Sequence, residues 1–145
     1  CYTHRRLLAQ TALQLIADGK KQKAINILKK ADVEIPAYNV TLDYMSGGLD
    51  MARGWLLTGQ KAKGKEYVEA VWKNAYQYLN YYLSLSNDRF LQSQNDCIRQ
   101  IMIMQSVCDV AGMVSPQLQK SYEKQLNALY TLYRGRGGSM PQGNQ

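Results

Sequence analysis

Apolar residues recur every three or four positions along most of this chain, which is the spacing of an α-helix with one buried face. The pattern predicts an all-α fold. Six helices are expected, over approximately residues 3–18, 20–34, 45–58, 61–83, 90–111 and 116–133. Residues 36–44 follow neither helical nor strand spacing and are expected to form an ordered loop. Residues 101–104 are apolar on every side, so the helix that contains them is expected near the centre.

Glycine and proline mark the ends of several predicted helices. Gly19 and Gly59 stand where the apolar pattern stops, and glycine readily takes the left-handed conformation that ends many helices. Pro36 lacks a backbone N–H group and is expected to follow a helix end. Ser115 followed by Pro116 is typical of a helix start.

The predicted helices are expected to pair, because small residues recur at corresponding positions. Two antiparallel helices approach closely where small side chains face each other. Gly19 and Gly59 stand forty residues apart. An alanine precedes each glycine by seven positions and a small residue follows each by five, which gives Ala12, Ala52, Ala24 and Gly64.

This spacing resembles the tetratricopeptide repeat. The first pair carries the resemblance at Ala12, Leu15, Gly19, Ala24, Leu28, Ala31 and Pro36. The second pair keeps Ala52, Trp55 and Gly59 but has Tyr76 where proline is usual, and the third pair matches only in outline. The forty-residue period exceeds the usual length of about 34, and the surplus fits the loop at 36–44. The resemblance implies three antiparallel helix pairs in a right-handed superhelix, with an unrelated helical bundle as the alternative.

A second resemblance includes the loop. The stretch RRLLAQTALQLIADGKKQKAINILKKADVEIPAYNVTLDY, together with YYLSLS at residues 81–86, resembles the soluble C-terminal region of a family of large bacterial membrane proteins. That family is uncharacterised, common in Bacteroidetes and distantly related to the protein O-mannosyltransferases. The resemblance covers about residues 3–86 and implies a domain tethered to a membrane on its extracytoplasmic, periplasmic side, with a cytoplasmic location as the alternative. It assigns no catalytic residue here, because the transferases keep theirs in the membrane part.

Length and composition limit the other possibilities. The chain of 145 residues fits one domain, expected over residues 1–133, with a flexible C-terminal tail at 134–145. The chain contains no run of about 18 apolar residues, so no membrane-spanning helix is expected in it. The first residue is Cys1, so we expect a piece of a longer protein, with a lipidated terminal cysteine as the alternative.

The net charge of +7 comes from 18 basic and 11 acidic residues. Much of the basic excess lies at Lys20, Lys21, Lys23, Lys29 and Lys30, on the expected polar face of one helix. We do not expect nucleic acid as a partner, because its binding surfaces combine arginine with stacking aromatic rings. Such a face is ordinarily just solvated, and attraction to an anionic membrane or an acidic polymer is the functional alternative.

Candidate catalytic and metal-binding groups are few. Cys97 and Cys108 stand eleven apart in one predicted helix, too far for a disulfide, and are expected to be buried. The single histidine, His4, cannot complete a metal site with them, so no metal and no cofactor are expected. Glutamates in the 61–83 helix are expected to pair with lysines, and Asp43 and Asp50 to cap a helix.

The candidate binding residues form two sets. One set consists of tyrosines, and the other lies on the helices that would line the concave face of a repeat array. Tyr67, Tyr78 and Tyr81 lie at the edge of an apolar stripe and could form an aromatic surface for a peptide or a sugar chain, or simply border the core. The first helix of each pair lines the concave face of such arrays and nominates Arg5, Gln10, Gln14, Tyr44 and Arg53. We therefore expect a non-catalytic protein-interaction or scaffold module. The alternative is a carbohydrate- or peptide-binding domain that uses a tyrosine-rich cleft.

Overall fold

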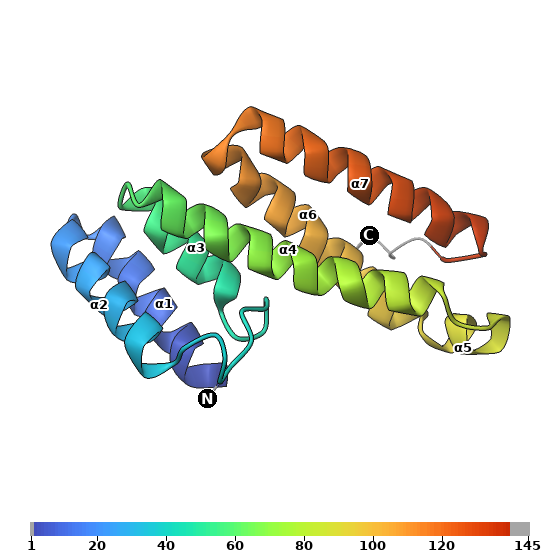
Figure 1. Cartoon of the computed structure of the whole chain (residues 1–145), viewed down its shortest axis with the longest axis horizontal. Helices are drawn as coiled ribbons and strands as arrows, with labels where there is room; N and C mark the ends of the chain where they lie inside the picture. Colours follow the sequence, from blue (N-terminus) through green and yellow to red (C-terminus); the bar gives the residue numbers. More distant parts are fainter. Residues whose placement is uncertain (1, 140–145) are drawn as a thin grey trace.

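Residues 2–139, the part of the chain that this computed structural model describes, contain seven α-helices and no β-strand (Figure 1). The prediction of an all-α fold is confirmed. The helices are α1 (Tyr2–Ala17), α2 (Lys21–Glu34), α3 (Gly48–Leu57), α4 (Lys61–Leu83), α5 (Asn87–Gln92), α6 (Gln94–Val114) and α7 (Pro116–Gly135).

The long helices pack as three neighbouring hairpins. Helix α1 packs against α2, α3 against α4, and α6 against α7, and successive hairpins meet where α1 contacts α3 and α4 contacts α6 (Figure 1). Helix α6 also contacts α3 and α5. Its expected position near the centre is therefore confirmed.

The first two hairpins turn in the same way, at the two predicted glycines. Gly19 and Gly59 both have positive φ, 77° and 83°. In each turn, the N–H of the residue after the glycine bonds to a carbonyl five positions back, at 2.8 Å, from Lys20 to Leu15 and from Gln60 to Trp55. This is the bonding of a helix end that closes on a left-handed residue.

Small residues allow close helix contact within the hairpins, as predicted. Ala24 and Ala52 are fully buried, and Gly64 is buried as well. A methyl group placed on Gly64 would lie 2.4 Å from Leu56 Cγ and 3.4 Å from the Ala52 carbonyl oxygen, so only glycine fits without rearrangement.

Two predicted helices differ from the structure. The helix expected at 45–58 begins at Gly48, because residues before it form a tight turn in which Gly47 has a φ of 84°. The helix expected at 90–111 is divided at Ser93 into α5 and α6. The Ser93 hydroxyl donates to the Arg89 carbonyl at 2.8 Å, a local bond of the kind that competes with regular helix.

The C-terminal boundary lies beyond residue 133. Helix α7 continues to Gly135, and the Arg136 guanidinium donates to the Leu83 carbonyl at 2.6 Å. The Tyr133 hydroxyl donates to the Ser139 carbonyl at 2.8 Å. Residues 134–139 are thus held against the helices rather than forming a flexible tail, and the rest of the predicted tail, 140–145, lies outside the described residues.

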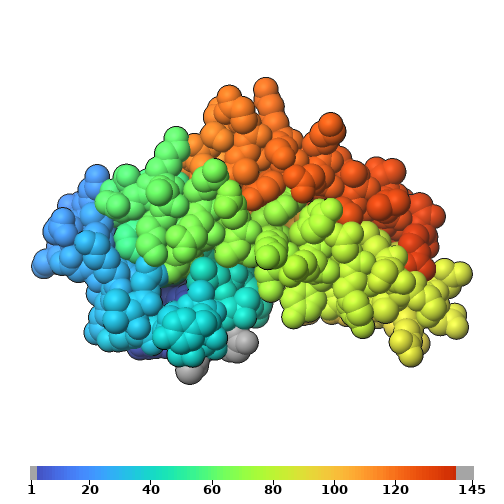
Figure 2. Space-filling model, in the orientation of Figure 1, coloured from blue at the N-terminus to red at the C-terminus, as the bar shows by residue number. Residues whose placement is uncertain are grey.

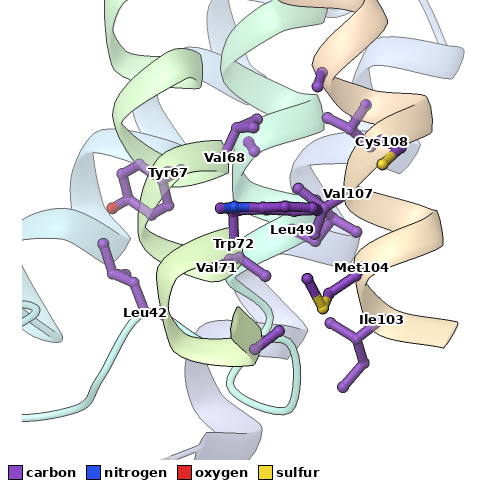
Figure 3. Close-up of a cluster of buried hydrophobic side chains, with 14 of the residues drawn as sticks. Leu42, Leu49, Tyr67, Val68, Val71, Trp72, Ile103, Met104, Val107 and Cys108 are labelled. Atoms are coloured by element: carbon purple, nitrogen blue, oxygen red, sulfur yellow. The ribbon is translucent and has the colours of Figure 1, made fainter. Parts of the chain in front are cut away.

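The core between the second and third hairpins is built around Trp72 (Figure 3). The indole ring stacks on Tyr122 of α7, with centroids 4.0 Å apart and planes 6° apart. Cys97 and Cys108 are buried and unpaired, as predicted. Burial raises the pKa of each thiol to about 11 and that of the Tyr122 phenol to about 12.

Candidate functional site

A hollow, here called the α6 groove, lies between the loop at 35–47 and the outer side of α6. Its volume is about 610 Å³. The loop contributes Tyr44 and Met45, and α6 contributes a row of side chains that includes Arg99 and Met102. The polar lining groups from α6 are Asn95, Arg99, Gln105, Ser106 and Asp109.

Large apolar side chains reach solvent in this groove. Met45 is 59% exposed, Met102 is 56% exposed and Tyr44 is 45% exposed. Methionine is flexible and polarisable, and it is frequent on surfaces that adapt to a partner. The groove therefore offers an adjustable apolar wall with polar groups along one side.

The groove continues toward the first hairpin. Tyr44 and Met45 also line a small recess with Arg6 and Asp50, and Met45 lines another with Arg6 and Asp43. Arg6 and Arg99 form no ion pair with any residue in the described range 2–139. One unpaired guanidinium group thus lines the groove itself, and another lines the recesses beside it.

Arg5 holds the loop that forms this wall. Its side chain is fully buried, and Nη2 donates to the carbonyl oxygens of Ile35 and Val40 at 2.8 and 2.6 Å. Nη1 donates to the Thr41 carbonyl at 2.9 Å and to Ser46 Oγ at 3.0 Å. Burial lowers the pKa of Arg5, and nearby carboxylates partly offset that effect. The prediction that Arg5 is an exposed binding residue is wrong.

The loop is also closed by its own hydrogen bonds. The Ser46 N–H donates to Asp43 Oδ1 at 2.7 Å, and Ser46 Oγ donates to the Thr41 carbonyl at 2.7 Å. The Gly48 N–H donates to the Asp43 carbonyl at 2.8 Å. Asp43 therefore organises the turn before α3, close to its predicted capping role, and this turn presents Tyr44 and Met45 to the groove.

The other candidates on the first helices are dispersed. Gln10 and Gln14 are exposed on α1, and Gln14 donates to Asp18 at 3.2 Å. Arg53 is partly exposed and pairs with Asp50 at 3.0 Å. Gln10, Gln14 and Arg53 do not line the α6 groove, so Tyr44 is the predicted residue that the structure places there.

Tyr67 is a core residue. Its ring is buried, and its hydroxyl donates to the Asp32 carboxylate of α2. Lys63 pairs with the same carboxylate at 3.0 Å, and this hydrogen bond raises the pKa of Lys63. The prediction that Tyr67 belongs to a binding surface is wrong, because it links the first two hairpins instead.

Tyr78 and Tyr81 are exposed and form a separate surface on α4. They line a shallow depression of about 410 Å³ with Asn74 and Gln77. Tyr82 lies beside both, its centroid 6.4 Å from that of Tyr78 and 5.5 Å from that of Tyr81. Aromatic faces next to amide side chains are the chemistry that can hold a sugar ring.

The residues of α6 that line the groove were not among the predicted site residues. Apolar neighbours at 101–104 suggested burial on all sides, yet Met102 is exposed. The signal was present in the polar residues, because Asn95, Arg99, Ser106 and Asp109 recur at helical spacing and define an outer face that includes position 102.

No group of three His, Cys, Asp or Glu side chains that could hold a metal ion occurs within residues 2–139. Comparison of the chain with protein-family models, with curated proteins and with solved structures finds no match. The function is therefore argued from the geometry of the site.

Proposed function

We propose that this chain is a non-catalytic protein-interaction module and that the α6 groove binds a peptide segment of a partner protein. The observation that carries the proposal is the exposure of Met45, Met102 and Tyr44 in one groove. The backbone of the loop on one side of this groove is held by the hydrogen bonds of Arg5. Exposed apolar groups gathered in a concave surface are typical of an interaction site.

The order of helix contacts supports a tetratricopeptide-like superhelix. The first helices of the hairpins meet in series, because α1 contacts α3 and α3 contacts α6. Of the second helices, α4 contacts α7, and α2 is joined to α4 by the hydrogen bond between Tyr67 and Asp32. Repeat arrays of this kind bind partners along the layer of first helices, and α6 belongs to that layer.

The lining defines the chemistry of the peptide. Apolar side chains of the peptide pack on Met45, Met102 and Ile98, and an acidic side chain pairs with Arg99. A second acidic residue toward the loop would reach Arg6. The expected ligand is therefore a short apolar segment with acidic residues on one or both sides.

A random peptide library displayed on phage and selected on the chain tests this proposal. Selected peptides should be enriched in apolar and acidic residues. Met102→Glu should weaken their binding by at least about tenfold, and Arg99→Glu should do so for the acidic peptides. Leu132→Glu is the matched control, because Leu132 is equally exposed but lies on α7.

The proposal fails if the selected peptides bind the Met102→Glu and Leu132→Glu variants equally well. Circular dichroism of each variant checks that the helices are intact. Both substitutions are at exposed positions, so loss of folding is not expected to obscure the comparison.

A carbohydrate-binding function is the second candidate, and the depression on α4 favours it. Tyr78 and Tyr81 provide exposed rings, and Asn74 and Gln77 provide amide donors and acceptors. On a glycan array, wild-type binding that is lost in Tyr81→Ala and kept in Met102→Glu would support this candidate. Uniformly negative arrays would contradict it.

We also propose that the module works on the extracytoplasmic side of a membrane-bound, glycosyltransferase-like protein, as the resemblance over residues 3–86 implies. Helix α6 is long and apolar enough to cross a membrane, but much of it is buried against α3, α4 and α7, as in the core helix of a globular domain. An alkaline phosphatase fusion to the C-terminus of the natural protein tests the location. An active fusion supports the extracytoplasmic side, and an inactive but stable fusion supports the cytoplasm.

A further inference from the structure

The turns within the three hairpins lie along one edge of the molecule. Residues 18–23, 57–66 and 113–120 contain these turns and the adjoining helix ends, and are here called the turn edge. Figure 1 shows the three turns in succession from α1–α2 to α6–α7, and Figure 2 shows the blue, green and orange surfaces adjoining there.

Contacts between the turns confirm that they form one surface. A methyl group on Gly59 would lie 3.9 Å from Lys21 Nζ, so the first turn reaches the second. Lys61 and Lys65 line a recess of about 630 Å³ with Val114 and Leu118, so the second turn adjoins the third.

This edge concentrates the positive charge of the chain. It carries seven lysines and two acidic residues, in a chain whose formal net charge is +7. Lys63 and Lys65 pair with acidic residues, whereas Lys20, Lys21, Lys23 and Lys61 form no ion pair among residues 2–139.

The charge of this edge comes from its lysines rather than from the helix ends. Helices α2, α4 and α7 begin at the turn edge, and α1, α3 and α6 end there, so the positive and negative ends of the helix dipoles offset each other. Neither α2 nor α4 has an acidic residue in its first turn that would reduce the positive charge of the lysines.

Two exposed apolar side chains accompany the lysines. Leu57 is 50% exposed at the end of α3, and Met113 is 43% exposed near the end of α6. Each lies within two residues of its turn. The three segments contain no arginine and no aromatic residue, whereas surfaces for single-stranded nucleic acid combine such residues.

We infer that the turn edge docks on an anionic lipid surface. The lysines pair with lipid phosphates, and Leu57 and Met113 enter the boundary between headgroups and acyl chains. The loop that walls the α6 groove lies at the other end of the hairpins, so docking leaves that groove open (Figure 1). The inference does not depend on the proposed peptide binding.

Sedimentation of the 145-residue chain with lipid vesicles tests this inference. The chain should bind vesicles of phosphatidylcholine with phosphatidylglycerol and not vesicles of phosphatidylcholine alone. Each lysine at a membrane surface contributes about fivefold to binding, so the triple variant Lys20→Glu, Lys21→Glu, Lys61→Glu should bind at least about a hundredfold more weakly.

A matched control separates the edge from net charge. The triple variant Lys29→Glu, Lys73→Glu, Lys124→Glu changes the formal charge equally at exposed positions away from the turns. It should retain most of the affinity. Equal losses in the two triple variants would overturn the inference.

Two further arms complete the test. Leu57→Ser with Met113→Ser should weaken vesicle binding several-fold, whereas Leu91→Ser with Leu132→Ser, at similarly exposed positions outside the edge, should not.

Single-stranded RNA tests the competing partner. Tight RNA binding that the edge variant loses, with no binding to anionic vesicles, would overturn the inference in favour of nucleic acid.

Discussion

Arg5 Nη1 donates a 3.0 Å hydrogen bond to Ser46 Oγ, across forty-one positions of sequence. Through this bond and three others to loop carbonyls, the first helix holds the turn that precedes α3. That turn carries Tyr44 and Met45 into the α6 groove. The buried Arg5 thus fixes the position of the loop that forms one wall of the α6 groove, although Arg5 does not line the groove.

Replacing Arg5 should destabilise the protein strongly. Arg5→Ala leaves buried carbonyl groups without a donor, and the free energy of unfolding should fall by about 3 kcal/mol. Arg5→Lys should recover only part of this loss, because an ammonium group cannot reproduce the set of N–H donors on the planar guanidinium. Arg6→Ala is the control, since Arg6 is exposed. Urea unfolding measures all three, and equal stability of Arg5→Ala and Arg6→Ala would contradict the assigned role.

Adding a methyl group at Gly64 should separate α3 from α4. Gly64→Ala places carbon 2.4 Å from Leu56 Cγ, and the crowding should cost about 1–3 kcal/mol despite the better helix propensity of alanine. Leu56→Ala removes the obstructing atoms, so the double variant should lose less than the two single losses combined. Gly135→Ala, with open space around it, should be neutral or slightly stabilising. Thermal or urea unfolding distinguishes these outcomes, and strict additivity would argue against the close contact.

The stack of Trp72 on Tyr122 should contribute a measurable coupling energy. A double-mutant cycle with Trp72→Leu and Tyr122→Leu should show about 0.5–1.5 kcal/mol of favourable interaction beyond area burial. Trp72→Leu with Tyr130→Leu provides the comparison, since Tyr130 lies on the same helix and is not stacked on the indole. The coupling is read from urea unfolding, and equal values in the two cycles would rule out a specific contribution from the stack.

Stability should decline in alkaline solution. Burial raises the pKa of Cys97 and Cys108 from 9.0 to about 11 and that of Tyr122 from 10.0 to about 12. The unfolded chain therefore loses these protons at lower pH than the folded chain. The contribution of the three neutral groups to folding stability is complete below pH 9 and is lost as pH rises toward 11 and 12. The urea midpoint under reducing conditions should fall over this range. Replacing both cysteines with alanine should make the fall shallower, and an unchanged slope would contradict the thiol contribution.

Local features of the fold followed from the sequence because their causes are local. Helices arise from bonds between residues four apart, and the ends at Gly19 and Gly59 need only one left-handed residue each. Small residues at positions 24, 52 and 64 were enough to predict close hairpins. The split at Ser93 was missed because no glycine or proline marks it in the sequence.

What the tertiary structure alone decided was which side chains are buried and which surfaces meet. Arg5 reads as a surface residue in sequence, but its acceptors stand 30 to 41 positions away. Tyr67 is buried, and its hydroxyl donates to Asp32 of another hairpin. The α6 groove is formed by a loop and by a helix that lies some fifty residues later in the sequence. Burial depends on the neighbours that folding brings together, and helical periodicity describes only one element at a time.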